Sequence, residues 1–148
     1  MTFVSTKTYG HDLGLSAAFR QWRAASHCSR IHGYALRVRL EFEAEELDGN
    51  NWVMDFGGLK QIKAWLESQF DHKLLVAADD PALRDLINLQ TLGLADIVII
   101  PATGCEAFAN MVFKYVDAWL DEHGHTPRVR LSSVEVCEHG ANSAIYRP

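Results

Sequence analysis

A polar segment before residue 34 carries the first group of side chains whose types and spacing could do chemistry. It contains one thiol and two imidazoles close together, at Cys28, His27 and His32. A thiolate and imidazoles at such short range could hold a transition metal or pair a nucleophile with a base. The same residues also suit an ordinary polar loop in which Cys28 turns inward. The spacing alone leaves both interpretations open.

A carboxylate beside an imidazole, Asp71 and His72, forms the second candidate. Such a carboxylate can orient the imidazole and tune it as a general acid or base near neutral pH. A histidine at the end of a helix also interacts favourably with the helix dipole. The pair therefore fits either catalysis or the closing of a helix.

Two isolated glutamates complete the candidates. Thr103 and Glu106 have the spacing of a capping box, which would give Glu106 a purely structural role. Glu138 follows an alternating segment, where a carboxylate is usually solvated. If Glu138 faces a cleft, it would suit a bidentate partner such as an amidine-like N–C–NH2 edge.

Hydrophobic periodicity predicts the elements that must position these residues. Residues 34–44 and 129–138 alternate between apolar and polar side chains, which predicts antiparallel strands with one buried face. Residues 57–70 and 103–123 carry apolar stripes at helical spacing. Further expected elements are an extended segment at 3–18 with a bend near Gly10 or Gly14, a short helix at 81–89, a buried strand at 97–100 and a hairpin partner at 143–146. The order predicts an α+β domain.

Composition narrows the class of protein. The 148 residues suit a single domain, 1–148, and their net charge of −5 with no basic block argues against nucleic-acid or membrane partners. No segment approaches the roughly 18 apolar residues of a membrane span. The three cysteines cannot all pair within one chain, which favours a reducing compartment. We expect a cytoplasmic protein that handles a small molecule.

Several short motifs form an ordered set along the chain. The segments are LSAAF at 15–19, CSRIHGY at 28–34, WVMDFGGLK at 52–60, FDHKLL at 70–75, PATGCEAFA at 101–109 and VEVCE at 134–138. They resemble F-S-A-A-H, C-x-x-x-H-G-H, M-V-x-D-F-x-x-L-K, L-D-H-x-x-L-N, P-T-x-E-N-x-A and V-x-V-x-E. These are motifs of the 6-pyruvoyl-tetrahydropterin synthase / 6-carboxy-tetrahydropterin synthase family, in the family's order. Each is weak alone, but the set covers nearly the whole chain.

The resemblance implies a T-fold, an antiparallel four-stranded sheet with two long helices on one face. It also implies a homo-oligomer, a trimer or hexamer, with sites between subunits. In the family a glutamate clamps the amino-pyrimidine edge of the pterin, a role that falls on Glu138, with Glu106 as the second substrate contact. A cysteine and an Asp-His pair transfer protons, which implies Cys28 and Asp71–His72.

The family's zinc ion is held by three histidines, and here those positions read Phe19, His32 and Tyr34. A phenyl ring cannot ligate a metal, and His32 alone falls short of the usual three protein ligands. His27 and Cys28 are the nearest possible substitutes. We therefore expect the family's zinc site to be absent or much weakened.

The function implied by the resemblance is that of a lyase acting on the side chain of 7,8-dihydroneopterin triphosphate. The nearer branch is 6-carboxy-5,6,7,8-tetrahydropterin synthase, which feeds 7-deazaguanine and queuosine synthesis. Arg20, Arg23 and Arg30 could contact the triphosphate or could be solvated surface. The alternative is a non-catalytic or altered T-fold paralogue that binds a pterin or purine ring without zinc.

Overall fold

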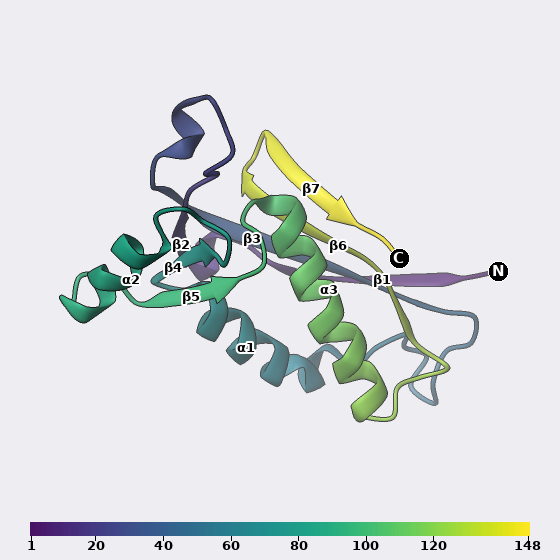
Figure 1. Ribbon diagram of the computed structural model, residues 1–148. Coiled ribbons are helices and arrows are strands. Elements are labelled where there is room, and N and C mark those ends of the chain that lie inside the picture. The colour runs from purple at the N-terminus through teal and green to yellow at the C-terminus, as the bar shows by residue number, and fades with distance from the viewer.

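One long strand, β3 (His32–Ala44), organises the sheet in the computed structural model, which describes residues 1–148 (Figure 1). The other strands are β1 (Phe3–Tyr9), β2 (Leu15–Phe19), β4 (Lys73–Ala77), β5 (Ile97–Ile100), β6 (Arg130–His139) and β7 (Asn142–Tyr146). The helices are α1 (Lys60–Phe70), α2 (Leu83–Thr91) and α3 (Cys105–Glu122). Short 3-10 turns occur at His11–Leu13, His27–Ser29 and Phe56–Leu59.

Antiparallel pairing along β3 builds the framework. β1 and β2 pair with successive parts of β3, from Phe3 opposite Ala44 to Phe19 opposite His32. They act as one long strand with a turn in the middle, where Gly14 has a left-handed φ of 77° that favours glycine. The bend predicted in this segment is confirmed. β6 pairs with the other edge of β3, and β7 pairs with β6.

The two long helices, α1 and α3, lie side by side on one face of this sheet (Figure 1). They are joined by stacking of Trp65 on Tyr115, with ring centroids 3.9 Å apart, and by a hydrogen bond of 2.8 Å from Trp119 Nε1 to Gln61 Oε1. The antiparallel strands and the two helices confirm the predicted α+β T-fold. None of the helices combines the length and hydrophobicity needed to cross a membrane.

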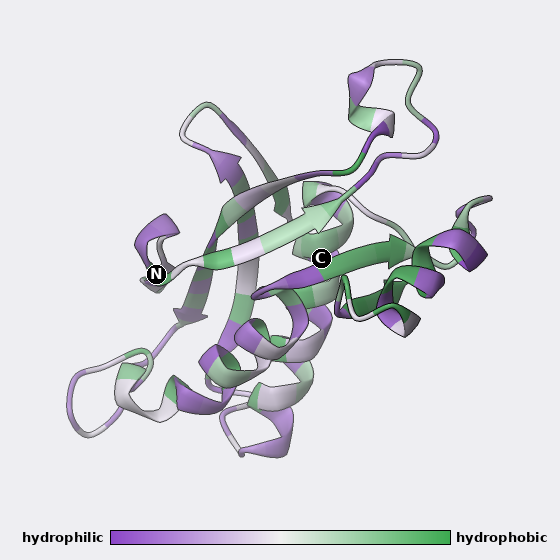
Figure 2. Ribbon diagram, turned by 90° about the vertical axis from the view of Figure 1, so that its left-hand side faces the viewer, coloured by the Kyte–Doolittle hydropathy of each residue, from purple (hydrophilic) through white to green (hydrophobic).

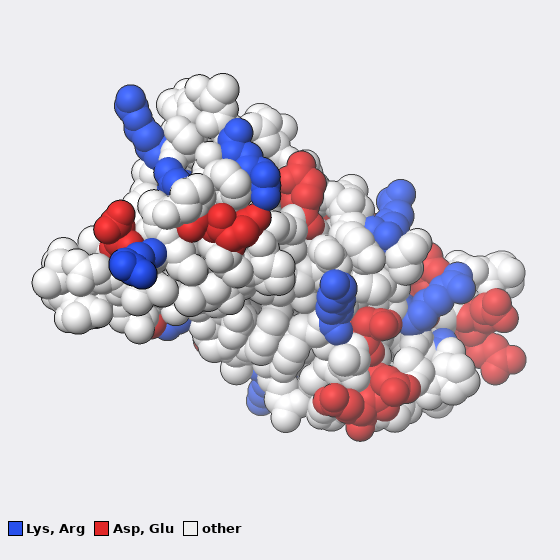
Figure 3. All heavy atoms as spheres, in the orientation of Figure 1, with Lys and Arg blue, Asp and Glu red and all other residues white.

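Alternation along β3 determines which side chains enter the core. Its inward residues Leu36, Val38, Leu40 and Phe42 are fully buried beneath the helices. The residues between them are partly exposed, as predicted for a strand with one wet face. In Figure 2 hydrophilic and hydrophobic residues are mixed along the helices and several strands, whereas one strand is hydrophobic along most of its length. On the face drawn in Figure 3, cations and anions are interspersed and form no continuous basic patch.

A parallel extension, which sequence patterning predicted only in part, enlarges one edge of the sheet. β4 pairs with β2 and β5 pairs with β4, both in parallel, so the seven-stranded sheet is mixed. The predicted strand at 97–100 is confirmed as β5. β4 was missed because Leu74, Leu75 and Val76 are all buried, and a parallel strand buried on both faces shows no alternation.

The core of this framework gives a test by a matched pair of leucines. Leu66 in α1 is fully buried, whereas Leu92 at the end of α2 is 61% exposed. We expect Leu66→Ala to lower the free energy of unfolding by about 2–5 kcal/mol and Leu92→Ala by less than about 0.5 kcal/mol. Urea unfolding followed by circular dichroism measures both. Equal effects of the two substitutions would contradict the packing of α1 described above.

Candidate active site

The candidate site lies where the start of β3, the end of β6 and the first turn of α3 meet. Cys28 lies in the 3-10 turn before β3, where its backbone N–H is 3.4 Å from Ser26 Oγ. Tyr34 belongs to the inward row of β3, because strand alternation places it with buried Leu36. Glu138 lies near the end of β6, where the pairing with β7 is irregular between Cys137 and His139. Cys105 is the first residue of α3 and is buried.

Electrostatic coupling shows that these groups are neighbours. Burial is the main cause that raises the pKa of Cys105 to about 12. The nearby carboxylates of Glu138 and Glu106 contribute to the same shift, Glu138 also by a hydrogen bond with the thiol. Burial also raises the pKa of Tyr34, as do the nearby carboxylate of Glu138 and the ionisable thiols of Cys28 and Cys105. Both groups therefore stay protonated at neutral pH. They line the site as neutral hydrogen-bonding groups beside one carboxylate.

The structure thus brings Cys28, Glu106 and Glu138 into one cluster, around two residues that sequence reasoning did not assign to the site. Cys105 enters the sequence-based prediction only as one of three unpaired thiols, and Tyr34 only as the loss of an imidazole. The position of Cys105 next to Glu106 was the available signal for it. Glu138 is half-buried and Glu106 is exposed.

The predicted capping box at the start of α3 is wrong. The N-cap is Gly104 rather than Thr103, and its φ of 112° suits glycine. The amide end of the Gln21 side chain lies against Gly104 and would have to move to admit a Cβ there. The Thr103 hydroxyl instead donates to the carbonyl oxygen of Arg20 at 2.7 Å. Glu106 is therefore free of a capping partner, and its charge favours the N-terminal turn.

No hydrogen bond or ion pair joins the Asp71–His72 pair to this cluster. His72 follows α1 with a left-handed φ of 57°, and its Nδ1 is 2.8 Å from Asp71 Oδ1. Its side chain is 84% exposed. It borders an open groove of about 480 Å³ that Ser16, Gly33 and Tyr34 also line. Ser16 lies on the face opposite the helices, between buried Leu15 and Ala17. The carboxylate holds the imidazole in one orientation, as the acid–base interpretation requires.

Aromatic rings occupy the three positions at which the resemblance places zinc ligands. Phe19 is fully buried, with ring centroids 5.1 Å from His32, 6.1 Å from Tyr34 and 5.0 Å from Phe108. His32 Nδ1 is 2.7 Å from the carbonyl oxygen of Arg30, within its own loop.

The chain contains no group of three histidine, cysteine or acidic side chains arranged to hold a metal ion. His27, the other predicted ligand, is exposed. The residues at these positions do not fit a zinc ion with three protein ligands.

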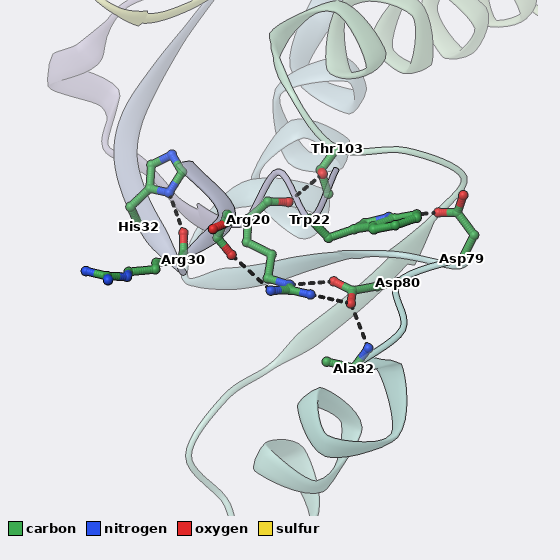
Figure 4. Close-up of polar contacts among 9 residues, drawn as sticks. Arg20, Trp22, Arg30, His32, Asp79, Asp80, Ala82 and Thr103 are labelled. Atoms are coloured by element: carbon green, nitrogen blue, oxygen red, sulfur yellow. Dashed lines mark hydrogen bonds and ion pairs between the residues drawn. The ribbon is translucent and has the colours of Figure 1, made fainter. Parts of the chain in front are cut away.

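The three arginines of the Cys28 loop have different environments. Arg20 forms an ion pair with Asp80, and Arg23 pairs with Asp79 while its guanidinium lies over the Trp22 ring. Arg30 makes no side-chain hydrogen bond or ion pair and points away from the loop in Figure 4. Of the three, Arg30 alone keeps its guanidinium unpaired for an anionic ligand.

Comparison with known proteins assigns the family. Residues 11–148 match the family model described as 6-pyruvoyl tetrahydropterin synthase. The chain belongs to this family. It is 28% identical over 138 residues to the 6-carboxy-5,6,7,8-tetrahydropterin synthase of Bacillus subtilis, covering 93% of this chain and 82% of that one. The enzyme of the same name from Aquifex aeolicus is 24% identical, covering 90% and 84%.

Solved structures show the same fold. An uncharacterized protein from Wolinella succinogenes superposes with a TM-score of 0.85 at 18% identity, covering 99% of this chain and 98% of that one. The 6-pyruvoyl tetrahydropterin synthase of Plasmodium falciparum superposes with a TM-score of 0.71 at 14% identity, with the same coverage. The T-fold predicted from the motifs is therefore confirmed for this member of the family.

The environment of Cys105 gives a pH-dependent test. Because its pKa is about 12 in the folded chain and close to 9 when unfolded, the unfolded state loses its proton first as the pH rises. We expect the Cys105 term to lower the free energy of unfolding by about 1 kcal/mol between pH 9 and pH 10. Cys105→Ala should remove this part of the alkaline slope in denaturant titrations. An unchanged slope would show that the thiol is not held protonated.

Proposed function

We propose that the chain binds a pterin through Glu138 and acts on the side chain of 7,8-dihydroneopterin triphosphate. The observation that carries this proposal is the half-buried Glu138 carboxylate beside the neutral Tyr34 and Cys105. The amino-pyrimidine edge of a pterin presents two adjacent N–H donors, and a carboxylate accepts both in a bidentate pair. A partly desolvated carboxylate is better suited to this than a solvated one.

The chemistry at the side chain requires proton transfer, for which the chain offers two groups. Cys28 lies beside the Glu138 cluster, and Asp71–His72 supplies an oriented imidazole on the other face of the sheet. Because no hydrogen bond or ion pair within the chain joins Cys28 to the Asp71–His72 pair, we propose that the site is completed between protomers of a homo-oligomer, a trimer or hexamer. The outer edges of β1 and β7 pair with no other strand within the chain and are available for such assembly.

The relatives named 6-carboxy-5,6,7,8-tetrahydropterin synthase support the finer assignment. We therefore propose a lyase of that type, working in the cytoplasm and feeding 7-deazaguanine and queuosine synthesis. Glu106, exposed in the first turn of α3, would make the second contact with the substrate.

One observation favours a second candidate, an altered paralogue that binds a pterin or purine ring without zinc. The buried ring of Phe19 and the phenol of Tyr34 occupy the positions of two ligands. In the first candidate, the chain's own acid and base groups must carry the reaction. In the second, ring binding persists without turnover. Incubation with 7,8-dihydroneopterin triphosphate, with and without added zinc, separates the two.

Replacement of Glu138 tests the ring-binding proposal. Glu138→Ala should weaken the binding of neopterin by about 2 kcal/mol or more, a roughly thirtyfold rise in Kd, because a charge-assisted bidentate contact is lost. Glu135→Ala is the matched control, since Glu135 lies three residues before Glu138 in the same strand and contacts Arg37 and Ser143 instead of the cluster. Calorimetric titration measures both. Equal affinity in the wild-type and Glu138→Ala proteins would remove Glu138 as the anchor.

The metal proposal has its own test. Purified protein should contain far less than stoichiometric zinc, and Phe19→His combined with Tyr34→His should raise zinc affinity by restoring the three-imidazole set. Elemental analysis after dialysis measures the zinc content per chain, and thermal unfolding checks that the double variant folds. Stoichiometric zinc in the natural protein that persists in His32→Ala would show that the metal is held elsewhere. Stoichiometric zinc in the natural protein that is lost in His32→Ala would mean that His32 binds the metal and that other residues replace the two missing ligands.

A further inference from the structure

A buried ion pair lies just behind the Cys28 turn. Asp80 accepts two hydrogen bonds from Arg20, Nε to Oδ2 and Nη2 to Oδ1, both of 2.8 Å (Figure 4). The Asp80 side chain is 1% exposed and that of Arg20 is 25% exposed. The Asp80 carboxylate also accepts from the backbone N–H of Ala82 at 2.8 Å, at the start of α2. Burial of two charges carries a desolvation cost, so the pair needs an explanation beyond stability.

The remaining contacts of Arg20 point to the explanation. Its Nη1 donates to the carbonyl oxygen of Ser29 at 2.9 Å, the residue after Cys28. The backbone N–H of the next residue, Gln21, donates to the carbonyl oxygen of Cys28 at 2.9 Å. The Arg20 carbonyl oxygen accepts from the hydroxyl of Thr103, two residues before α3 begins. Arg20 therefore connects the Cys28 turn to the starts of α2 and α3.

We propose that Arg20 and Asp80 are positioning residues that hold the Cys28 turn against the Glu138 cluster. An arginine is required because its planar guanidinium donates two hydrogen bonds to Asp80 and a third to the carbonyl of Ser29. A lysine ammonium does not hold its donors in such a fixed planar arrangement. The carboxylate fixes the guanidinium, and the guanidinium fixes the carbonyl of Ser29, directly after Cys28. The consequence for turnover rests on the function proposed above, but the effect on the thiol does not.

A second ion pair on the same loop provides an internal comparison. Arg23 pairs with Asp79 at 2.7 Å, with side chains 72% and 52% exposed, and the indole of Trp22 donates to the same carboxylate. This pair also links the loop to the segment before α2. It is solvated and makes no contact with the backbone around Cys28. Solvated pairs contribute little, so its removal should leave the turn in place.

The test measures the alkylation rate of each cysteine by iodoacetamide and mass spectrometry in the full-length protein. In Arg20→Lys and Asp80→Asn, Cys28 should react about tenfold faster, since loss of a charged hydrogen bond raises the population of locally open states. Cys105 and Cys137 are buried and should stay protected. Arg23→Lys and Asp79→Asn are the matched controls and should leave all three rates unchanged. In turnover assays, Arg20→Lys should lower kcat more than it changes KM.

The outcomes separate positioning from general stability. An unchanged Cys28 rate in folded Arg20→Lys overturns the proposal, as does a parallel rise at all three cysteines, which reports global loosening. If Asp80→Asn fails to fold, Arg20→Lys decides alone, because it keeps the charge and can still donate to Asp80. If neither the wild-type protein nor any variant turns over 7,8-dihydroneopterin triphosphate, the proposed function fails. The alkylation rates still decide the role of Arg20 in that case.

Discussion

Pairing along β3 is the constraint on which the rest of the structure depends. β1, β2 and β6 all take their register from this strand, so its alternation decides which side chains enter the core and which reach the site. The inward row that buries Leu36 and Phe42 under the helices continues to Tyr34 and His32 at the strand's start. A shift of register by one residue would turn this whole row to the solvent face. The site is therefore positioned by the same packing that stabilises the fold.

A buried aromatic ring sets the chemical character of this member of the family. Phe19 is fully buried and packs edge-on against Phe108 of α3, which in turn contacts Phe70 of α1. The Phe19 ring thus lies between the candidate site and the core beneath the helices. The family's zinc site would need an imidazole at this position instead. In our proposal, the site keeps the carboxylate and thiol of the family and replaces metal ligation by aromatic packing around His32 and Tyr34.

The sequence predicts the main framework because its signals are local. Alternation and helical stripes place β3, β6, α1 and α3 within a few residues of their bounds. The side-chain contacts of the site join residues that are far apart in the sequence, so they produce little local sequence pattern. Thr103 has the spacing of a cap, but Arg20, far away in sequence, takes its hydroxyl. The Arg20–Asp80 pair likewise joins segments about sixty residues apart, which no local pattern predicts.

Crystallographic determination of the oligomer with bound neopterin would test the central claim most directly, which is that Glu138 anchors a pterin in a site shared between protomers. The account predicts the 2-amino group and the adjacent ring N–H within about 3 Å of the two Glu138 oxygens. It also predicts that the Asp71–His72 pair facing the pterin side chain comes from a second protomer. A pterin bound away from Glu138, or a site completed within one chain, would contradict it.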